Sequence, residues 1–63
     1  MINIDMWHGD NYKSCDKIDV FFNDLGAYYC GWIYKDNKII GDYTCSNSIE
    51  LEKTFKHLVF NWD

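Results

Sequence analysis

With 63 residues, 48% of them hydrophobic and 19% aromatic, the chain suits one small packed domain and is too rich in aromatic residues for intrinsic disorder. Its formal net charge is −4, it has no arginine, and its six lysines are scattered along the sequence, so it lacks the basic stripe on which nucleic-acid recognition commonly depends. No apolar run approaches the roughly 20 residues of a membrane span, and the first ten residues show no signal-peptide pattern. We therefore expect a single cytoplasmic domain over residues 1–63.

The first predicted element is a strand from Ile2 to Trp7, because apolar and polar residues alternate in this segment. The polar segment from His8 to Asp16 contains Gly9 and Asn11, so it is predicted to be a loop. The sequence leaves open whether this first strand pairs with the strand that follows the loop or with a strand of a second copy of the chain.

Residues 18 to 45 are predicted to form a three-stranded antiparallel meander, because three runs rich in β-branched and aromatic residues are separated by two turn sequences. The second of these turns, Asp36-Asn37, suits a two-residue hairpin, since both residues tolerate a positive φ better than most. This turn places Tyr34 opposite Ile39, and the register is expected to continue unbroken from that pair.

The first turn, Asp24-Leu25-Gly26, suits a three-residue loop with Gly26 in the left-handed conformation. A register shifted by one residue would mix the polar Asp19 and Asn23 into an apolar face, which favours the three-residue loop. The two registers together predict one core face of the sheet. Its members are Ile18, Val20, Phe22, Tyr28, Cys30, Trp32, Tyr34, Ile39, Tyr43 and Cys45, with Gly41 opposite Trp32.

The opposite sheet face is predicted to be apolar as well, since it carries Phe21, Tyr29, Ile33 and Ile40 among polar residues. Nothing else in so short a chain covers all of this face, and an exposed apolar sheet face is typical of a binding or assembly surface. These four residues are therefore the candidate partner-binding residues. The alternative is that they are ordinary exposed apolar residues or are covered by the N-terminal loop.

A helix is predicted to begin near Asn47, because Asn47 and Glu50 resemble a capping box, with Ser46 as a competing N-cap. Apolar residues at helical spacing form one stripe that fits across the core face, consisting of Leu51, Phe55, Leu58 and Trp62. The predicted fold class is therefore α+β: an antiparallel meander of three to four strands with one C-terminal helix packed on one face.

No residue pattern predicts a catalytic site, a cofactor, a metal ion or a small-molecule ligand. His57 is expected to be a solvated helix residue, and the spacing of His8 and Cys15 matches no known metal motif. An odd number of cysteines is unlike a disulfide framework, so Cys30 and Cys45 are expected to pack as small hydrophobic side chains.

Aromatic residues on one strand, Tyr28, Trp32 and Tyr34, would suit a stacking platform for single-stranded nucleic acid. The predicted register instead assigns all three to the core face. A three-stranded sheet followed by a helix also resembles, in topology, the DNA-binding N-terminal domain of conjugative-transposon integrases and AP2-type domains. Those domains present basic residues on the outer sheet face, where this chain is predicted to present Asp19 and Asp42, so DNA binding does not carry over.

The segments from Tyr29 to Thr44 and from Asn47 to Phe55 cover about half the chain. They are similar to short uncharacterised proteins encoded in conjugative transposons and related mobile elements of low-GC Gram-positive bacteria. That resemblance implies a genetic setting and no activity.

These observations together favour a small non-enzymatic accessory protein of a mobile genetic element. It is expected to act by protein–protein contact and to form a homo-oligomer through the outer sheet face. Two alternatives stay open, namely a nucleic-acid-associated regulator and an acidic decoy that occupies the DNA-binding site of a host defence protein. A net charge of −4 with unclustered acids is modest for such mimicry.

Overall fold

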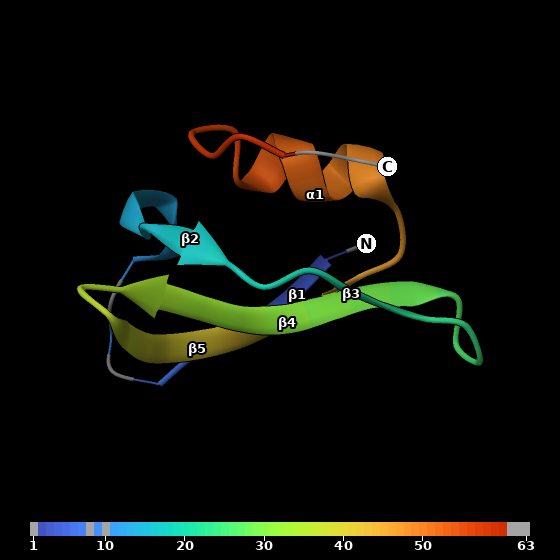
Figure 1. The fold of residues 1–63 in the computed structure, drawn as a ribbon, viewed down its shortest axis with the longest axis horizontal. Helices are drawn as coiled ribbons and strands as arrows, with labels where there is room; N and C mark the ends of the chain where they lie inside the picture. Colours follow the sequence, from blue (N-terminus) through green and yellow to red (C-terminus); the bar gives the residue numbers. More distant parts are fainter. Residues whose placement is uncertain (1, 8, 10, 61–63) are drawn as a thin grey trace.

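The computed structural model describes residues 2–7, 9 and 11–60 of the chain. The elements in chain order are β1 (Ile2–Met6), the 3-10 helix η1 (Tyr12–Ser14), β2 (Lys17–Ile18), β3 (Phe21–Asn23), β4 (Tyr28–Lys35), β5 (Lys38–Cys45) and α1 (Ser48–Thr54). Helix α1 lies over one side of a twisted antiparallel sheet (Figure 1). The predicted α+β class, with a C-terminal helix packed on one sheet face, is confirmed. No described helix has the length and apolar character needed to cross a membrane.

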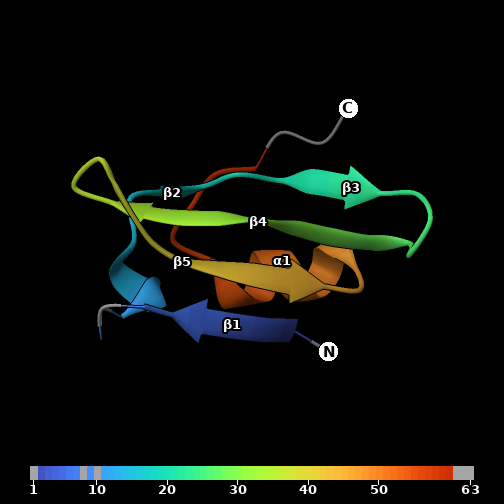
Figure 2. The ribbon, with the colours of Figure 1, turned by 90° about the horizontal axis from the view of Figure 1, so that it is seen from below.

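The strand order is β1-β5-β4, and the short strands β2 and β3 both pair along the remaining edge of β4 (Figure 2). Strand β1 is antiparallel to β5, with Ile4 opposite Tyr43. The first strand therefore pairs with a strand of the same chain and not with a strand of a second copy. Strand β1 forms the sheet edge farthest from β2, so the sheet is not a simple meander.

The hairpin between β4 and β5 has the predicted two-residue turn. Asp36 and Asn37 have φ angles of 52° and 63°, the left-handed values that such a turn requires. Tyr34 pairs with Ile39 as predicted. The connection predicted from the two turn residues is therefore confirmed.

Beyond that pair a β-bulge shifts the register by one residue. Ile40 is the extra residue, because Ile33 pairs with Gly41 and Trp32 pairs with Asp42. The predicted pairing of Trp32 with Gly41 is therefore wrong. Both Ile40 and Gly41 are buried as a result of the bulge.

The loop between β3 and β4 is one residue longer than predicted. It spans residues 24–27, and Asn23 pairs with Tyr28 on either side of it. Ala27, rather than Gly26, has the positive φ, at 52°. The side-chain oxygen of Asn23 accepts hydrogen bonds from two backbone N–H groups of the loop, at 3.0 and 3.1 Å. An asparagine that bonds its own turn in this way stabilises the longer loop.

The longer loop before β4 and the bulge after it each shift the register by one residue. As a result, each side chain of β4 points to the sheet face opposite to the predicted one, while β2, β3 and the part of β5 after the bulge keep their predicted orientation. Ile18, Tyr43 and Cys45 belong to the core or pack against it, as predicted. Strand β4, however, presents Ile33 to the core and Trp32 to the outer side. The prediction that Tyr28, Cys30, Trp32 and Tyr34 belong to the core face is therefore wrong. The predicted core residues Val20, Phe22 and Ile39 lie outside the core as well, at 38%, 53% and 39% exposed.

Gly31 is the residue of β4 at which the observed orientation depends on a close backbone approach. A Cβ atom at this position would collide with the backbone carbonyl oxygen of Asp19, in the crossing between β2 and β3. That carbonyl accepts a hydrogen bond from the hydroxyl of Tyr43, and the Asp19 N–H donates to the Trp32 carbonyl at 3.0 Å. Glycine thus admits the crossing segment, and Tyr43 holds it in place.

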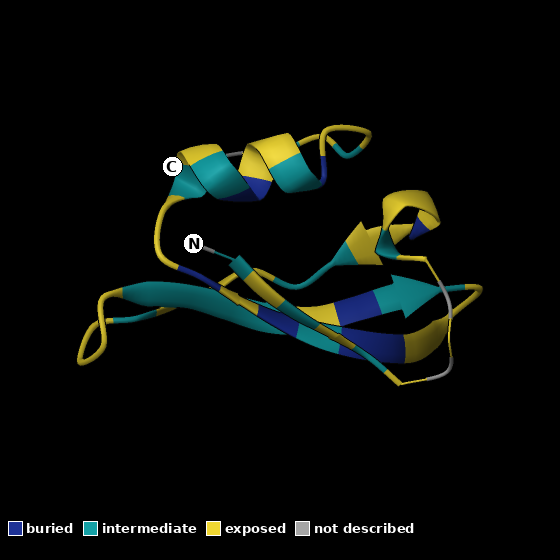
Figure 3. Ribbon diagram, turned by 180° about the vertical axis from the view of Figure 1, so that it is seen from behind, coloured by how far each residue is buried: buried dark blue, intermediate teal, exposed yellow. Residues whose placement is uncertain are grey.

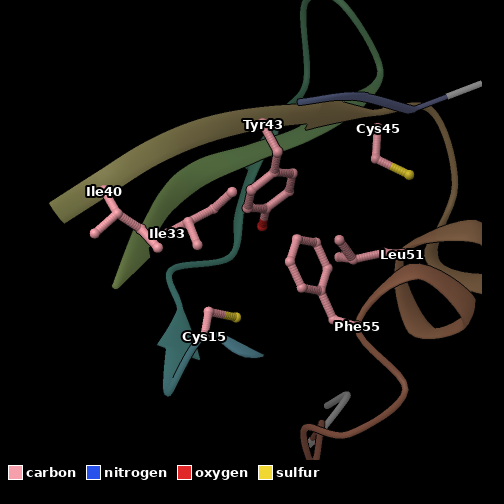
Figure 4. Packing of buried hydrophobic residues seen from close by; sticks show 7 residues of the cluster. All are labelled: Cys15, Ile33, Ile40, Tyr43, Cys45, Leu51 and Phe55. Atoms are coloured by element: carbon pink, nitrogen blue, oxygen red, sulfur yellow. The ribbon is translucent and has the colours of Figure 1, made fainter. Parts of the chain in front are cut away.

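The core lies between α1 and the sheet, where seven buried residues form one cluster (Figures 3 and 4). The cluster consists of Cys15, Ile33, Ile40, Tyr43, Cys45, Leu51 and Phe55. Leu51 and Phe55 confirm the predicted helix stripe, and Leu58 packs against the cluster. Trp62, the last predicted member of the stripe, lies outside the described residues.

Asn47, and not the competing candidate Ser46, is the N-cap of α1. Its backbone is extended, and its side-chain oxygen accepts a hydrogen bond of 2.7 Å from the Glu50 N–H. The helix ends at Thr54, with Phe55 as its C-cap. Leu58 therefore reaches the core from the turns that follow the helix, not from the helix itself.

Candidate functional site

The four predicted partner-binding residues do not share one surface. Ile33 and Ile40 are 0% and 4% exposed, so their predicted place on an outer face is wrong. Tyr29 packs against the core, with its ring 5.0 Å from that of Phe22. Phe21 alone stands out, at 55% exposed. Tyr29 and Ile33 face the core because β4 has the opposite orientation to the predicted one. Ile40 is buried because of the β-bulge.

The outer sheet face, on the side away from α1, carries a different apolar group, called here the outer patch. It consists of Trp7, Phe21, Cys30 and Trp32. Phe21 pairs with Cys30 across β3 and β4, so the two side chains share this face. Trp7 and Trp32 meet edge to face, with ring centroids 5.6 Å apart and an interplanar angle of 72°. Trp7 and Trp32 are 48% and 41% exposed.

Trp7 reaches the outer patch because the pairing of β1 with β5 continues for one residue beyond the strand. The Trp7 N–H donates to the Ile40 carbonyl at 2.9 Å. No pattern in the sequence predicted this contact, since the partner of the first strand was left open. The patch therefore joins the residue that follows β1 to side chains of β3 and β4 that are distant from it in sequence.

The outer patch contains a hollow of about 260 Å³. Its walls include the side chains of Phe21, Cys30 and Trp32, and Asp42 and Thr44 of β5 complete the lining together with Gly31 and Tyr43. Aromatic walls beside a carboxylate suit a planar or apolar group that leaves a polar edge in water. This hollow gives the patch a shape as well as an apolar character.

A second hollow, of about 340 Å³, adjoins the first over β1 and β5 and is acidic. Asp5 and Asp42 are directly opposite each other in the sheet, and both line this hollow with Asn3, Ile4 and Thr44. Like charges in this arrangement repel, so both carboxylates favour full hydration. The outer face thus has an apolar part, formed by Trp7 and by side chains of β3 and β4, beside an acidic part over β1 and β5. The described residues hold no group of three or more His, Cys, Asp or Glu side chains that could bind a metal ion.

Tyr28 and Tyr34 flank the outer patch, and their hydroxyls are hydrogen-bonded to protein groups. Tyr34 donates to the Asp19 carboxylate at 2.7 Å, and this hydrogen bond raises the pKa of Tyr34. The Lys17 ammonium lies 4.7 Å from the centre of the Tyr34 ring. The Tyr28 hydroxyl accepts from the Asn23 amide at 3.2 Å. The row of aromatic residues that the prediction buried is therefore on the outer side of the sheet.

Sequence reasoning missed a contact between Cys15 and His57, which are 42 residues apart. The His57 Nε2 atom lies 2.9 Å from the Cys15 carbonyl oxygen and 3.6 Å from its sulfur. A carbonyl oxygen only accepts, so Nε2 carries the hydrogen and donates it there. Burial raises the pKa of the Cys15 thiol, which favours the protonated, unreactive form. The pair therefore joins two segments and is not an activated nucleophile. His8, weighed above with Cys15, lies outside the described residues.

Comparison of the chain with protein-family models, with curated proteins and with solved structures gives no match. The fold and the site define a small α+β domain that presents aromatic side chains on the open face of its sheet. A function is therefore argued from that face.

Proposed function

We propose that the protein is a non-enzymatic accessory protein that acts by protein–protein contact and associates with a second copy of itself through the outer patch. The supporting observation is that three large aromatic side chains, Trp7, Phe21 and Trp32, are about half exposed on one sheet face. Complete burial of a side chain of this size is worth about 1.5–3 kcal/mol, so burying the exposed half of each favours association by roughly half that amount, before the cost of association is subtracted.

The dimensions of the molecule suit a modest dimer. It measures 29 × 21 × 18 Å, so its broad face covers about 600 Å². Two such faces in complete contact would bury about 1,200 Å² in total, the lower end of the range for specific interfaces, and an interface confined to the outer patch buries less. We therefore expect a reversible dimer that forms at micromolar or higher concentrations.

The charges on the outer face favour one arrangement of the two copies. A twofold axis through the outer patch brings Phe21 and Trp32 of one copy against the same residues of the other, because a twofold interface uses the same surface twice. Asp5, on β1, then lies toward the rim, whereas Asp42, opposite Trp32 in the sheet, lies at the edge of the buried patch. The setting in this proposal is the mobile genetic element that the resemblance of residues 29–44 and 47–55 implies.

Sedimentation equilibrium tests the self-association. We expect the wild-type protein to show a monomer–dimer equilibrium and the Trp32→Lys variant to dimerise at least about tenfold more weakly, because the lysine charge would be buried in the interface. Ile49→Lys is the matched control, since Ile49 is an exposed apolar residue on α1, away from the outer patch. A wild type that stays monomeric at millimolar concentration, or a control that weakens the dimer equally, would contradict the proposal.

The outward row of Tyr28, Trp32 and Tyr34 favours a second candidate function, that of a nucleic-acid-associated regulator. Base stacking on such a row is worth about 1–3 kcal/mol per base. Asp5 and Asp42 share the same face, however, and repel phosphate groups. We therefore expect no change in the fluorescence anisotropy of labelled oligo(dT) or duplex DNA at low salt, where attraction would be strongest. Binding to oligo(dT) that Trp32→Ala abolishes would replace the first proposal with the second.

A further inference from the structure

Three of the six lysines, scattered in the sequence, gather around one hollow in the fold. The hollow has a volume of about 380 Å³, and its lining consists of Tyr12, Lys13, Lys53, Thr54, Lys56 and His57. Among the residues that the structure describes, no carboxylate is part of that lining. In a chain of net charge −4, the hollow is a local concentration of positive charge.

Two segments that are distant in sequence form the walls of this hollow, called here the basic hollow. Tyr12 and Lys13 belong to η1, and the other lining residues belong to the last turn of α1 or directly follow it. The Tyr12 ring packs edge to face on Phe55, with centroids 5.8 Å apart. The hydrogen bond from His57 to the Cys15 carbonyl joins the same two segments at 2.9 Å. These contacts hold the walls together although the lysines repel one another.

A helix C-terminus favours nearby lysines through its partial negative charge, and that effect accounts for Lys53 and Lys56. It does not account for Lys13, which comes from the separate segment η1. It also gives no reason for a lining without a carboxylate. An anionic ligand would explain both features, because it would neutralise the three ammonium groups at once.

We propose that the basic hollow binds the phosphoryl group of a small phosphate monoester. Lys13, Lys53 and Lys56 supply the positive charge, and lysine is a common phosphate-binding residue in proteins. The Tyr12 hydroxyl is a further donor available to the ligand, whereas the His57 Nε2 hydrogen is already bonded to the Cys15 carbonyl.

The chemistry of the lining excludes one residue from this role. The Thr54 hydroxyl donates its hydrogen to the Glu50 carbonyl at 2.9 Å, so it has no hydrogen left for a phosphate oxygen. The volume of the hollow exceeds that of a phosphate group alone. A monoester with an organic substituent is therefore a better fit than inorganic phosphate.

Two-dimensional ¹H–¹⁵N NMR titrations of the full chain test this site, at constant pH and ionic strength. Inorganic phosphate, adenosine monophosphate and adenosine are the probes. We expect saturable shifts at Lys13 and at residues 53–57 with both phosphates, tighter binding of the monophosphate, and no saturable effect of adenosine. Equal binding of adenosine and its monophosphate, or shifts that sodium chloride reproduces, would overturn the proposal.

A double variant, Lys53→Gln with Lys56→Gln, should weaken phosphate binding by at least about tenfold, the effect of losing one or two charge-assisted hydrogen bonds. The control is Lys17→Gln with Lys38→Gln, which removes the same charge from two lysines that do not line the hollow. A control that weakens binding equally would mean that only net charge matters, which contradicts a site. The dispersion of the spectra shows whether each variant is folded. The basic hollow is remote from the outer patch, so its failure would leave the proposed self-association standing.

Discussion

Replacing Ile33 with lysine is expected to unfold the protein, whereas the same replacement of its neighbour Trp32 should leave it folded. Ile33 is fully buried in the core cluster, where a lysine ammonium would have neither water nor a charged partner. An unpaired buried charge costs several kcal/mol, against a total stability of roughly 3–9 kcal/mol for a domain of this length. Trp32 is partly exposed and faces Asp42, so a lysine there remains hydrated beside a carboxylate. Far-UV circular dichroism and urea denaturation measure both outcomes.

The conservative variant Ile33→Val serves as the control, and it should lose only about 0.5–1.5 kcal/mol. Trp32→Lys should lose about 1 kcal/mol through the missing ring contact with Trp7. The reverse order, with Trp32→Lys unfolded and Ile33→Lys folded, would mean that β4 has the orientation predicted from the sequence. The outer patch would then not exist, and the proposed self-association would lose its surface.

Features determined by neighbouring residues were predictable from the sequence. The Asp36-Asn37 turn, the N-cap at Asn47 and the burial of Leu51 and Phe55 all depend on residues within a few positions of one another. Turn type and helix capping follow from local backbone preferences and hydrogen bonds. The α+β fold class followed from these elements in order.

The orientation of β4 was not predictable, because both of its faces are apolar. Tyr29 and Ile33 lie on one face and Trp32 on the other, so alternation of apolar and polar residues does not distinguish core from surface. A single added residue in a connection reverses every side chain of a strand. Here the longer loop before β4 and the bulge at Ile40 each add one.

The candidate sites depend on contacts between distant segments, and for this reason only part of them was foreseen. Phe21 is the one predicted partner-binding residue that the structure leaves on the outer face. Trp7 joins it because β1 pairs with β5, a pairing that the sequence did not predict. Lys13 joins Lys53 because the Tyr12 ring packs on Phe55 and because His57 bonds the Cys15 carbonyl. None of these pairings leaves a pattern in a single sequence.

Phe55→Ala is expected to cost about 3–5 kcal/mol of unfolding free energy, as large aromatic truncations in a core do. Phe55 is fully buried and is the point where three parts of the fold meet. Its ring contacts Tyr43 of β5 at 5.7 Å and Tyr12 of η1 at 5.8 Å between centroids, and its N–H closes the helix on the Leu51 carbonyl at 3.1 Å. An alanine keeps that backbone bond but leaves a cavity between two tyrosines.

Urea denaturation followed by tryptophan fluorescence measures this loss, with Val59→Ala as the control. Val59 is an exposed apolar residue that follows the same helix, so its truncation should change the free energy of unfolding by no more than about 0.5 kcal/mol. A loss below about 1 kcal/mol for Phe55→Ala would show that the ring is not enclosed by the two tyrosines. Because Phe55 holds η1 against the end of α1, the walls of the basic hollow would then lack the support inferred for them.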